Sequence, residues 1–460
     1  MINNCRVIRK GETMDKETNN TNKTFHIQTF GCQMNEHDSE TLAGMLEELG
    51  YIEHKNKKEA DVAIINTCSV RENADKRFFG TLGQLKKAKE DRPEMVIAVC
   101  GCMMQQQHII DTLKAKYPWV DLIFGTHNLH EFPRLLTNVL NERGKVVDVW
   151  EDGGEIIEGL PAKREFPFKA YVNIMYGCNN FCTYCIVPFT RGRERSRRPE
   201  EIVREAKDLA ASGVKEIMLL GQNVNSYGIG TDFNVDFADL IYLLNEIEGL
   251  ERIRFMTSHP KDLSDKLIQA YRDCDKLCNS IHLPVQSGST EVLRRMNRKY
   301  TKEDYLLLIS KLREVVPDIS ITTDIIVGFP GETDEDFEET LDLARQVRFD
   351  SAFTFLYSIR KGTPAENYKE QVPEAVKHQR FNRLVELLNG ISAEKNKACE
   401  GQILDVLVEG PSKTDSKNYS GRTESGKLVN FKGSPDLTGK IIPVKITEGK
   451  TFSLLGEIMT

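Results

Sequence analysis

Three cysteines, Cys178, Cys182 and Cys185, lie close together in the segment YGCNNFCTYC. Their spacing is C-x3-C-x2-C, and no fourth cysteine follows nearby. Three thiolates can hold three irons of a cubane 4Fe-4S cluster and leave the fourth iron open to bind and reduce another molecule. Structural zinc sites instead pair C-x2-C units. We therefore interpret the triplet as the ligand set of a reactive iron–sulfur cluster. A tight loop of buried thiols is the alternative.

A second set of cysteines, Cys32, Cys68 and Cys102, is widely spaced, and each member closely follows a predicted strand. Parallel strands place their carboxyl ends along one sheet edge, where doubly wound folds bind ligands. The three thiols could converge there on a second cluster with an open iron. Buried structural thiols are the alternative. Alternation along a strand would place Cys100 on the same side as Cys102, unless the chain turns at Gly101.

Length and composition set the frame for these two sites. A chain of 460 residues is long enough for two to four domains of ~100–200 residues each. The net charge of −7 gives no global indication of nucleic-acid binding, so any basic surface must be local. No apolar run approaches the ~20 residues of a membrane span, and we expect no membrane association. Without a secretory signal, eleven cysteines favour a cytoplasmic location and metal ligation over disulfides.

Short apolar runs alternate with helical patterns from residue 24 onwards. The polar segment 1–23 before them lacks an apolar signal core and predicts a disordered leader. Strands at 25–30, 61–66, 95–99 and 120–124, with helices between them, predict a doubly wound parallel sheet over residues 24–145. Residues 146–169 contain a Gly-Gly pair and two prolines, which favour a linker.

A second series of strands and helices covers residues 170–399. Its six expected strands lie at 170–175, 216–220, 252–257, 279–283, 319–327 and 352–357. Six such units predict an α/β fold, an open partial (β/α)6 barrel. Residues 400–460 change to short strands separated by Gly and Pro, which predicts a small all-β barrel.

Polar or small residues follow several of these predicted barrel strands. Positions at the carboxyl ends of barrel strands are typical of active sites. The candidates are Gly221, Gln222, Ser258, Gln286, Ser287 and Asp324.

An arginine-rich run follows the cysteine triplet. Five arginines against one glutamate give +4 over eight residues. Arginine clusters suit phosphate contacts, and the position just after the cysteine loop favours that role over a solvated charged face. The candidate RNA-binding residues are Arg191, Arg193, Arg195, Arg197 and Arg198.

Six segments carry a resemblance to the radical S-adenosylmethionine methylthiotransferase family, which extends from about Thr24 to Thr460. They are GCQMNE at Gly31–Glu36, NTCSVRE at Asn66–Glu72, FGTHN at Phe124–Asn128, RGRERSR at Arg191–Arg197, HLPVQSGS at His282–Ser289 and GFPGET at Gly328–Thr333. The SVRE and GTHN sequences favour the group that acts on N6-dimethylallyl adenosine in tRNA over its sibling groups. The resemblance implies an amino-terminal methylthiotransferase domain (24–145), a radical barrel (170–399) and a TRAM domain that binds RNA (400–460).

The resemblance also implies roles for the candidate residues. Cys178, Cys182 and Cys185 would ligate a radical cluster whose open iron chelates S-adenosylmethionine, and Tyr184 would lie near the adenine unless it is a core aromatic. The strand-end candidates would contact S-adenosylmethionine. Cys32, Cys68 and Cys102, in preference to Cys100, would ligate an auxiliary 4Fe-4S cluster that carries or donates sulfur.

The function implied by the resemblance is addition of a methylthio group to carbon 2 of the prenylated adenosine next to the anticodon. The reaction would use two S-adenosylmethionine molecules, a tRNA anticodon stem-loop, an electron donor and a sulfur donor. We expect a monomer. Two alternatives stay open: a methylthiotransferase for threonylcarbamoyl adenosine in tRNA or for a ribosomal-protein aspartate, and a non-catalytic iron–sulfur protein that binds RNA.

Overall fold

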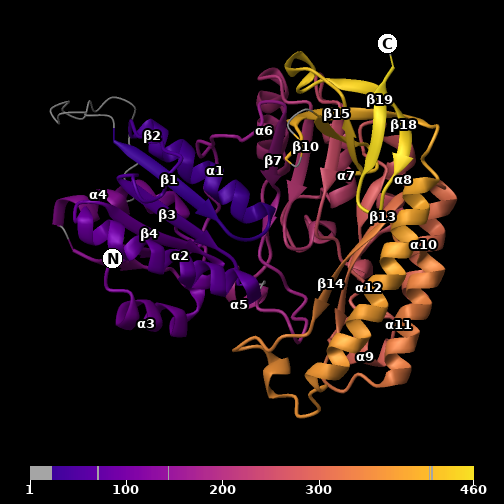
Figure 1. Cartoon of the computed structure of the whole chain (residues 1–460), viewed down its shortest axis with the longest axis horizontal. Helices are drawn as coiled ribbons and strands as arrows, with labels where there is room; N and C mark the ends of the chain where they lie inside the picture. The colour runs from indigo at the N-terminus through magenta and orange to yellow at the C-terminus, as the bar shows by residue number, and fades with distance from the viewer. Residues whose placement is uncertain (1–22, 70–71, 143, 414, 416–417, 460) are drawn as a thin grey trace.

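The computed structural model describes residues 23–69, 72–142, 144–413, 415 and 418–459. The expected leader over residues 1–23 lies, apart from Lys23, outside this range. The chain forms a first α/β domain, a larger second α/β domain and a small β-barrel, in sequence order (Figure 1). This architecture confirms the predicted fold class. None of the helices in the described ranges is long and apolar enough to cross a membrane.

The first domain is built on a six-stranded parallel sheet in the order β2-β1-β3-β4-β5-β6. Its strands are β1 (Thr24–Thr29), β2 (Ile52–Glu53), β3 (Val62–Thr67), β4 (Val96–Gly101), β5 (Leu122–Phe124) and β6 (Val146–Asp148). β3 and β4 lie in the middle and are buried along their whole length. Continuous apolar runs such as VIAV in β4 are typical of strands covered on both faces.

Helices cover both faces of this sheet. They are α1 (Gln33–Glu48) and α4 (Phe132–Glu142) on one face, and α2 (Glu72–Asp91) and α3 (Gln107–Lys116) on the other. Ile64 of β3 packs in the same core as Leu42 of α1. The next residue, Ile65, packs in the opposite core with Leu82 of α2. The carboxyl ends of the neighbouring strands β1, β3 and β4 therefore meet at one edge, where ligands bind in such folds.

The two edge strands escape prediction from the sequence. β6 falls inside the range 146–169 that we predict to be a linker, so the connecting segment begins only after Asp148. β2 and β6 have two and three residues, and their side chains are exposed or half-buried. Runs this short at a sheet edge carry too few apolar residues for a periodic signal.

The second domain contains six parallel strands in two sheets, β11-β10-β7 and β12-β13-β14. The strands are β7 (Lys169–Asn173), β10 (Glu216–Leu220), β11 (Arg252–Phe255), β12 (Ser280–His282), β13 (Ser320–Val327) and β14 (Ser351–Leu356). The helices are α6 (Pro199–Ala211), α7 (Phe237–Asn245), α8 (Asp265–Asp273), α9 (Thr290–Arg295), α10 (Lys302–Val315), α11 (Asp334–Val347) and α12 (Glu374–Lys397). β11 contacts β12, so the two sheets form one open, partial barrel.

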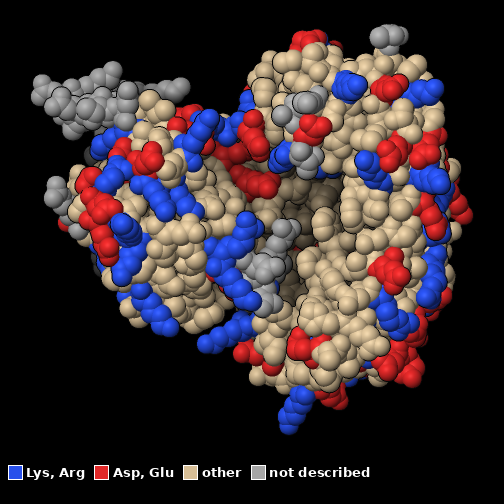
Figure 2. Space-filling model, in the orientation of Figure 1, with Lys and Arg blue, Asp and Glu red and all other residues tan. Residues whose placement is uncertain are grey.

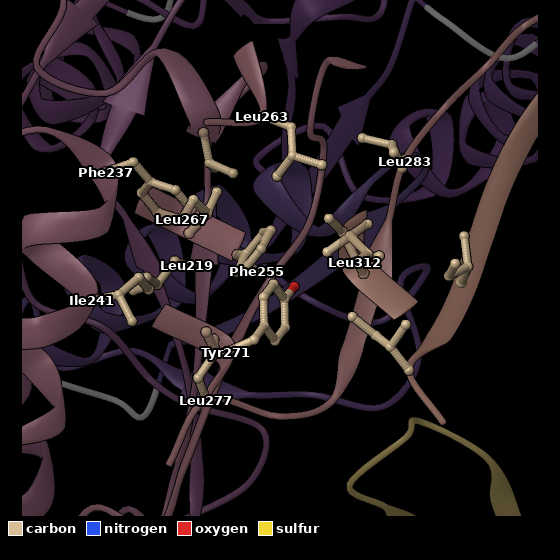
Figure 3. Close-up of a cluster of buried hydrophobic side chains, with 14 of the residues drawn as sticks. Leu219, Phe237, Ile241, Phe255, Leu263, Leu267, Tyr271, Leu277, Leu283 and Leu312 are labelled. Carbon is tan, nitrogen blue, oxygen red and sulfur yellow. The ribbon is translucent and has the colours of Figure 1, made fainter. Parts of the chain in front are cut away.

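Large apolar side chains fill the space between the barrel strands and their helices (Figure 3). Phe255 of β11 meets Phe237 of α7 edge-to-face, with ring centroids 5.0 Å apart. Tyr271 of α8 also contacts Phe255, at a centroid distance of 6.2 Å. Such aromatic pairs add about 0.5–1.5 kcal/mol beyond the burial of their area. This core holds the strands whose carboxyl ends carry the candidate residues.

The third domain is a closed five-stranded barrel in the order β15-β16-β17-β19-β18. The strands are β15 (Ile403–Pro411), β16 (Tyr419–Thr423), β17 (Leu428–Phe431), β18 (Ile441–Gly449) and β19 (Leu454–Ile458). Sequence patterns miss β16, because YSGRT has little apolar alternation. The aromatic rings of Tyr419 and Phe431 are buried in the core of this barrel.

Buried arginines join the small barrel to the second domain. Arg254 donates to the carbonyl oxygen of Thr423 at 2.7 Å, and Arg252 donates to that of Asp405 at 2.9 Å. Arg254 also pairs with the buried carboxylate of Glu216 at 2.9 Å. The small barrel therefore docks at the amino-terminal ends of β10 and β11. The candidate cofactor residues follow the opposite, carboxyl ends of the strands.

Candidate functional site

The cysteine triplet lies on a tight loop between β8 (Met175–Tyr176) and α5 (Val187–Thr190). Gly177 starts the loop with a φ of 76°, and a Cβ atom there would overlap the carbonyl group of Arg193. Only glycine fits such a position without strain. At the end of the loop the amide of Cys185 donates to the carbonyl oxygen of Cys182 at 2.9 Å. The backbone therefore folds back on itself and brings the three thiols together.

The thiols of this loop lie within electrostatic range of one another. Burial raises the pKa of Cys185 to about 12 and that of Cys178 to about 11, and the nearby Cys182 adds to both shifts. Like charges at short range disfavour ionisation, and burial does the same. The thiolate is the form that binds iron, so this pocket needs compensating positive charge.

Arg298 supplies positive charge beside this loop, residues 177–185, which we call the radical loop after the cluster expected there. Its buried guanidinium lies 3.6 Å from the sulfur of Cys182. The same group donates to the hydroxyl of Tyr300 at 2.8 Å and to the carbonyl oxygen of Pro284 at 2.7 Å. Neutral acceptors thus hold the guanidinium in place, and its charge is left to act on the thiol.

The three distant cysteines meet at the carboxyl edge of the first sheet. Cys32 lies between β1 and α1, Cys68 follows β3, and Cys102 begins the 3-10 helix η1 (Cys102–Gln105) after β4. Cys32 and Cys68 interact directly, and this contact, opposed by burial, lowers the pKa of Cys32 to about 6. The charge of Cys32 contributes to the raised pKa of Cys102, whose main cause is burial. The electrostatic contacts therefore link all three thiols.

Cys100 takes a different place from Cys102. Gly101 has a φ of 96° and turns the chain at the end of β4. Cys100 consequently stays in the core with Phe124, and burial raises its pKa well above the usual range. Cys102 lies past the turn and receives a hydrogen bond from Arg191 at 3.0 Å. The geometry favours Cys102 over Cys100 as a ligand.

An iron–sulfur cluster spreads its protein ligands more widely than a single metal ion does. Among the residues that the structure describes, no three His, Cys, Asp or Glu side chains converge closely enough to hold one ion. In a cubane cluster each thiolate binds a different iron, so its ligands are spread around the cluster. Two pockets that each present three thiols are consistent with that arrangement.

Unsatisfied polar atoms mark a second feature of the barrel. The hydroxyl of Ser258, the amide oxygen of Asn223 and both amide atoms of Asn225 are buried and have no hydrogen-bond partner among the described residues. Buried polar atoms normally have partners, so these fit a polar ligand such as S-adenosylmethionine. Thr257, which precedes Ser258, and Gln286 of the strand-end set have left-handed φ values of 66° and 70°. Such strained backbone is frequent at binding sites.

The other strand-end candidates have partners of their own. The side chain of Gln222 accepts a hydrogen bond from the amide of Gly177 at 2.8 Å, and it also contacts the sulfur of Met34 in α1. It therefore bridges the radical loop to the first domain. The carbonyl oxygen of Gly221 accepts from the hydroxyl of Thr257 at 2.7 Å.

Three candidates differ in how they are held. Asp324 lies 3.5 Å from the ring of His282 and is partly exposed. Tyr184 packs edge-on against Phe329, with ring centroids 6.5 Å apart. Ser287 is buried, and its hydroxyl lies 3.4 Å from that of Thr340 in α11, so it is directed into the packing of that helix.

The five arginines that we predict to contact RNA fall into three groups by exposure. Arg191 and Arg197 are buried, at 4% and 7% exposure, and each pairs with carboxylates. They are not accessible to a phosphate, which the charge pattern alone does not reveal. Arg193 and Arg198 are exposed. Arg195 is half-buried and donates to the carbonyl oxygen of Gly154 at 2.7 Å.

The loop that follows the radical cysteines joins the two thiol pockets. α5 packs against η1, which begins with Cys102. The hydroxyl of Thr126 donates to the carbonyl oxygen of Thr190 at 3.2 Å across the same interface. Figure 2 shows a hollow between the first domain and the rest of the molecule, and α5 lies at the junction of the two in Figure 1.

Three family models match the chain. They are the uncharacterized protein family UPF0004 over residues 24–125, the radical SAM superfamily over residues 172–344 and the TRAM domain over residues 397–459. Membership in the radical SAM superfamily implies a 4Fe-4S cluster and S-adenosylmethionine.

Curated relatives match almost the whole chain. The tRNA-2-methylthio-N(6)-dimethylallyladenosine synthase of Alkaliphilus oremlandii is 58% identical over 438 residues, which cover 95% of this chain and 93% of the relative. The synthase of Clostridium beijerinckii is 57% identical over 436 residues, covering 95% and 96%. The chain belongs to the tRNA-2-methylthio-N(6)-dimethylallyladenosine synthase family.

Two solved structures of proteins with much lower sequence identity have a similar fold. The radical S-adenosylmethionine methyltransferase TsrM from Kitasatospora setae superposes with a TM-score of 0.55 at 13% identity, covering 82% of this chain and 90% of that chain. The cobalamin-dependent S-adenosylmethionine radical enzyme OxsB gives a TM-score of 0.51 at 14% identity, covering 80% and 57%. At such low identity the likeness concerns the fold alone.

Sequence reasoning misses several residues of the candidate site in this synthase family member. Arg298 and Asp38 come close to the two thiol pockets only through the tertiary fold, so no local spacing reveals them. Asn225 could have been found, because GQNVNS directly follows β10. A polar run after a barrel strand is an active-site signal.

Proposed function

We propose that this protein adds a methylthio group to carbon 2 of N6-dimethylallyl adenosine next to the anticodon of tRNA, and that it does so with two 4Fe-4S clusters. The observation that carries the proposal is the joining of two three-cysteine pockets by one loop in a radical SAM enzyme of this synthase family. The pocket with Cys178, Cys182 and Cys185 would generate the radical. The pocket with Cys32, Cys68 and Cys102 would carry or donate the sulfur that is inserted. Because the substrate is tRNA, we expect the enzyme to act in the cytoplasm, as a monomer supplied by separate electron and sulfur donors.

The chain's own residues would divide the work between the pockets. Cys178, Cys182 and Cys185 would hold the radical cluster, and Cys32, Cys68 and Cys102 the auxiliary cluster. When bound, the radical cluster with S-adenosylmethionine supplies a 5′-deoxyadenosyl radical, which can remove hydrogen from an aromatic carbon that acid–base groups leave untouched. The unsatisfied atoms of Asn225 and Ser258 would orient S-adenosylmethionine.

A surface beside the radical loop suits the anticodon loop. The exposed guanidinium of Arg193 lies 4.4 Å from the ring centroid of Phe181, which neighbours Cys182. Phe189 lies edge-on to Phe181 and is 51% exposed. Aromatic and guanidinium planes stack unpaired bases, and arginine also contacts phosphates. We infer that the nucleotides flanking the target adenosine bind here, together with Arg195 and Arg198.

The test is nucleoside analysis of tRNA. A strain that lacks its own synthase accumulates the prenylated nucleoside without the methylthio group, and expression of this chain is expected to restore the methylthio product. Restoration should fail with Cys182→Ala, which serves as the matched inactive control. Continued absence of the product with the wild-type chain would contradict the proposal.

Assays of the purified, reduced protein distinguish the remaining alternatives. Incubation with S-adenosylmethionine is expected to release 5′-deoxyadenosine, which a non-catalytic RNA-binding protein would not do. Prenylated tRNA is expected to be methylthiolated, and threonylcarbamoylated tRNA is expected to stay unchanged. The reverse preference would assign the chain to the alternative substrate.

A further inference from the structure

Arg191 is a buried cation at the contact between the two cysteine pockets. Its Nε atom donates to the sulfur of Cys102 at 3.0 Å. Its Nη2 atom donates to the carboxylate of Asp38 at 2.9 Å, and the Asp38 side chain is 11% exposed. The guanidinium therefore has one thiol and one carboxylate as partners, and it is out of reach of solvent.

The two partners of Arg191 belong to the first domain, whereas Arg191 itself belongs to the second. It follows α5, which continues from the loop that carries Cys185. Asp38 lies on α1, which begins directly after Cys32. One side chain thus connects the radical loop to two of the elements that carry auxiliary cysteines.

The charge balance at Arg191 points to a role beyond packing. Asp38 neutralises the guanidinium, so a hydrogen bond from Arg191 to a neutral thiol would add little stabilisation. A bound cluster would change this balance, because its thiolates and sulfides would leave excess negative charge beside the buried guanidinium. A guanidinium donor there stabilises the reduced, more negative state of the cluster, since hydrogen bonds to cluster sulfurs raise the reduction potential.

We propose that Arg191, oriented by Asp38, is a positioning residue of the auxiliary cluster: it donates a hydrogen bond to the sulfur of Cys102, raises the reduction potential of that cluster and fixes it relative to the radical loop. The proposal rests on the assignment of the auxiliary cluster in the proposed function. It replaces the RNA-phosphate role that the charge pattern predicts for Arg191. It does not depend on which adenosine is the substrate.

The experiment is a redox titration monitored by electron paramagnetic resonance. The Cys182→Ala background removes the radical cluster, so the signal reports the auxiliary cluster alone. In that background Arg191→Met, which keeps an unbranched chain but loses charge and donors, is expected to shift the midpoint potential to more negative values. Arg191→Lys, which keeps the charge but loses the planar donor geometry, is expected to give a smaller shift.

The matched control is Arg298→Met in the same background. Arg298 contacts Cys182 and not the auxiliary pocket, so its loss is expected to leave the auxiliary potential unchanged. An unchanged potential in Arg191→Met, with the iron content of the background retained, would overturn the proposal. If Arg191→Met loses its iron, Arg191→Lys decides: an auxiliary potential equal to that of the background would again overturn it.

A second measurement distinguishes this proposal from the proposed function. Apparent Kd values for tRNA are expected to be the same within about twofold for the wild-type and Arg191→Lys proteins, because the side chain is buried. Weaker tRNA binding with an unchanged midpoint potential of the auxiliary cluster would indicate that Arg191 contacts a tRNA phosphate instead. A failed methylthiolation assay with a shifted potential would contradict the function and leave the role of Arg191 intact.

Discussion

The two cysteine sets that we propose as cluster ligands are assembled in different ways. The radical pocket takes its three thiols from eight consecutive residues, Cys178–Cys185, and its cation, Arg298, is held by neutral oxygens. The auxiliary pocket takes its thiols from the ends of three strands, and its cation arrives from the other domain with Asp38 as counter-ion. One pocket is local to a loop, and the other depends on the assembly of a sheet and an interface.

This difference suggests how each pocket responds to amino-acid substitutions. The loop carries all three thiols on one short segment, so its own backbone sets their spacing, although Gln222, Met296 and Arg298 also contact it. A distributed pocket depends on the register of β1, β3 and β4 and on the packing of α5 against η1. We therefore expect radical generation to be separable from sulfur insertion by substitutions at one pocket or the other.

Cys182→Ala is expected to have the largest effect. Loss of one of three ligands should remove the radical cluster and reduce 5′-deoxyadenosine formation by more than about 100-fold, since second-shell changes alone cost 10–100-fold. Reconstituted protein should keep about four of about eight irons, held by the auxiliary pocket. Iron and sulfide analysis with a cleavage assay checks both points. Complete loss of iron would show that the pockets are not independent.

Cys68→Ala is expected to give the complementary result. S-adenosylmethionine cleavage should continue, whereas the methylthiolated nucleoside should be absent. The measurement is 5′-deoxyadenosine and nucleoside analysis on the same reaction. Full methylthiolation by Cys68→Ala would rule out the two-cluster scheme.

Alanine at the glycine before a cysteine tests the two turns separately. Gly177 and Gly101 both have positive φ and lack room for a Cβ atom. Each substitution to alanine should destabilise its turn by about 3 kcal/mol, from backbone strain and overlap. Gly177→Ala should lower the occupancy of the radical cluster, and Gly101→Ala that of the auxiliary cluster. Iron content and redox spectra of the two variants check the separation.

Gly83→Ala is the control for these two variants. Gly83 lies within α2, and a Cβ atom there would meet no neighbouring atom within 4 Å. Alanine favours a helix over glycine by about 1 kcal/mol, so this variant should be slightly more stable and keep both clusters. Loss of a cluster in Gly83→Ala would show that the turns are not the cause of the loss in the other variants.

The comparison also explains what could be predicted from the sequence. Cys178, Cys182 and Cys185 could be proposed as ligands from the sequence because three closely spaced thiols form a recognisable pattern. The auxiliary cysteines become recognisable only when strands are placed before them and parallel strands are given a common edge. We predicted a phosphate contact for Arg191 from the charge run, but its side chain is buried and paired with Asp38, because a charge run does not show which of its members will be covered by the fold. Neighbours that are distant in sequence, such as Arg298 beside Cys182, leave no local pattern at all.

The interface between α1 and the segment before β7 allows a smaller test, based on pH. Burial raises the pKa of Glu40 to about 7 from 4.5, with Glu165 and Glu36 adding to the shift and the amide of Glu165 opposing it. Below pH 4.5 the carboxyl is protonated in the folded and unfolded states. Between pH 4.5 and about 7 the unfolded chain ionises first, so stability is lost as pH rises through this window.

Glu40→Gln removes this ionisation and keeps an oxygen that can accept the hydrogen bond from the amide of Glu165. Its free energy of unfolding should exceed that of the wild type by about 1 kcal/mol at pH 8, and the difference should vanish near pH 4.5. Urea unfolding of the reduced, cluster-free protein at several pH values measures this difference. A difference that does not change with pH would mean that Glu40 titrates normally. The contact between α1 and the segment before β7 would then be insensitive to pH in this range.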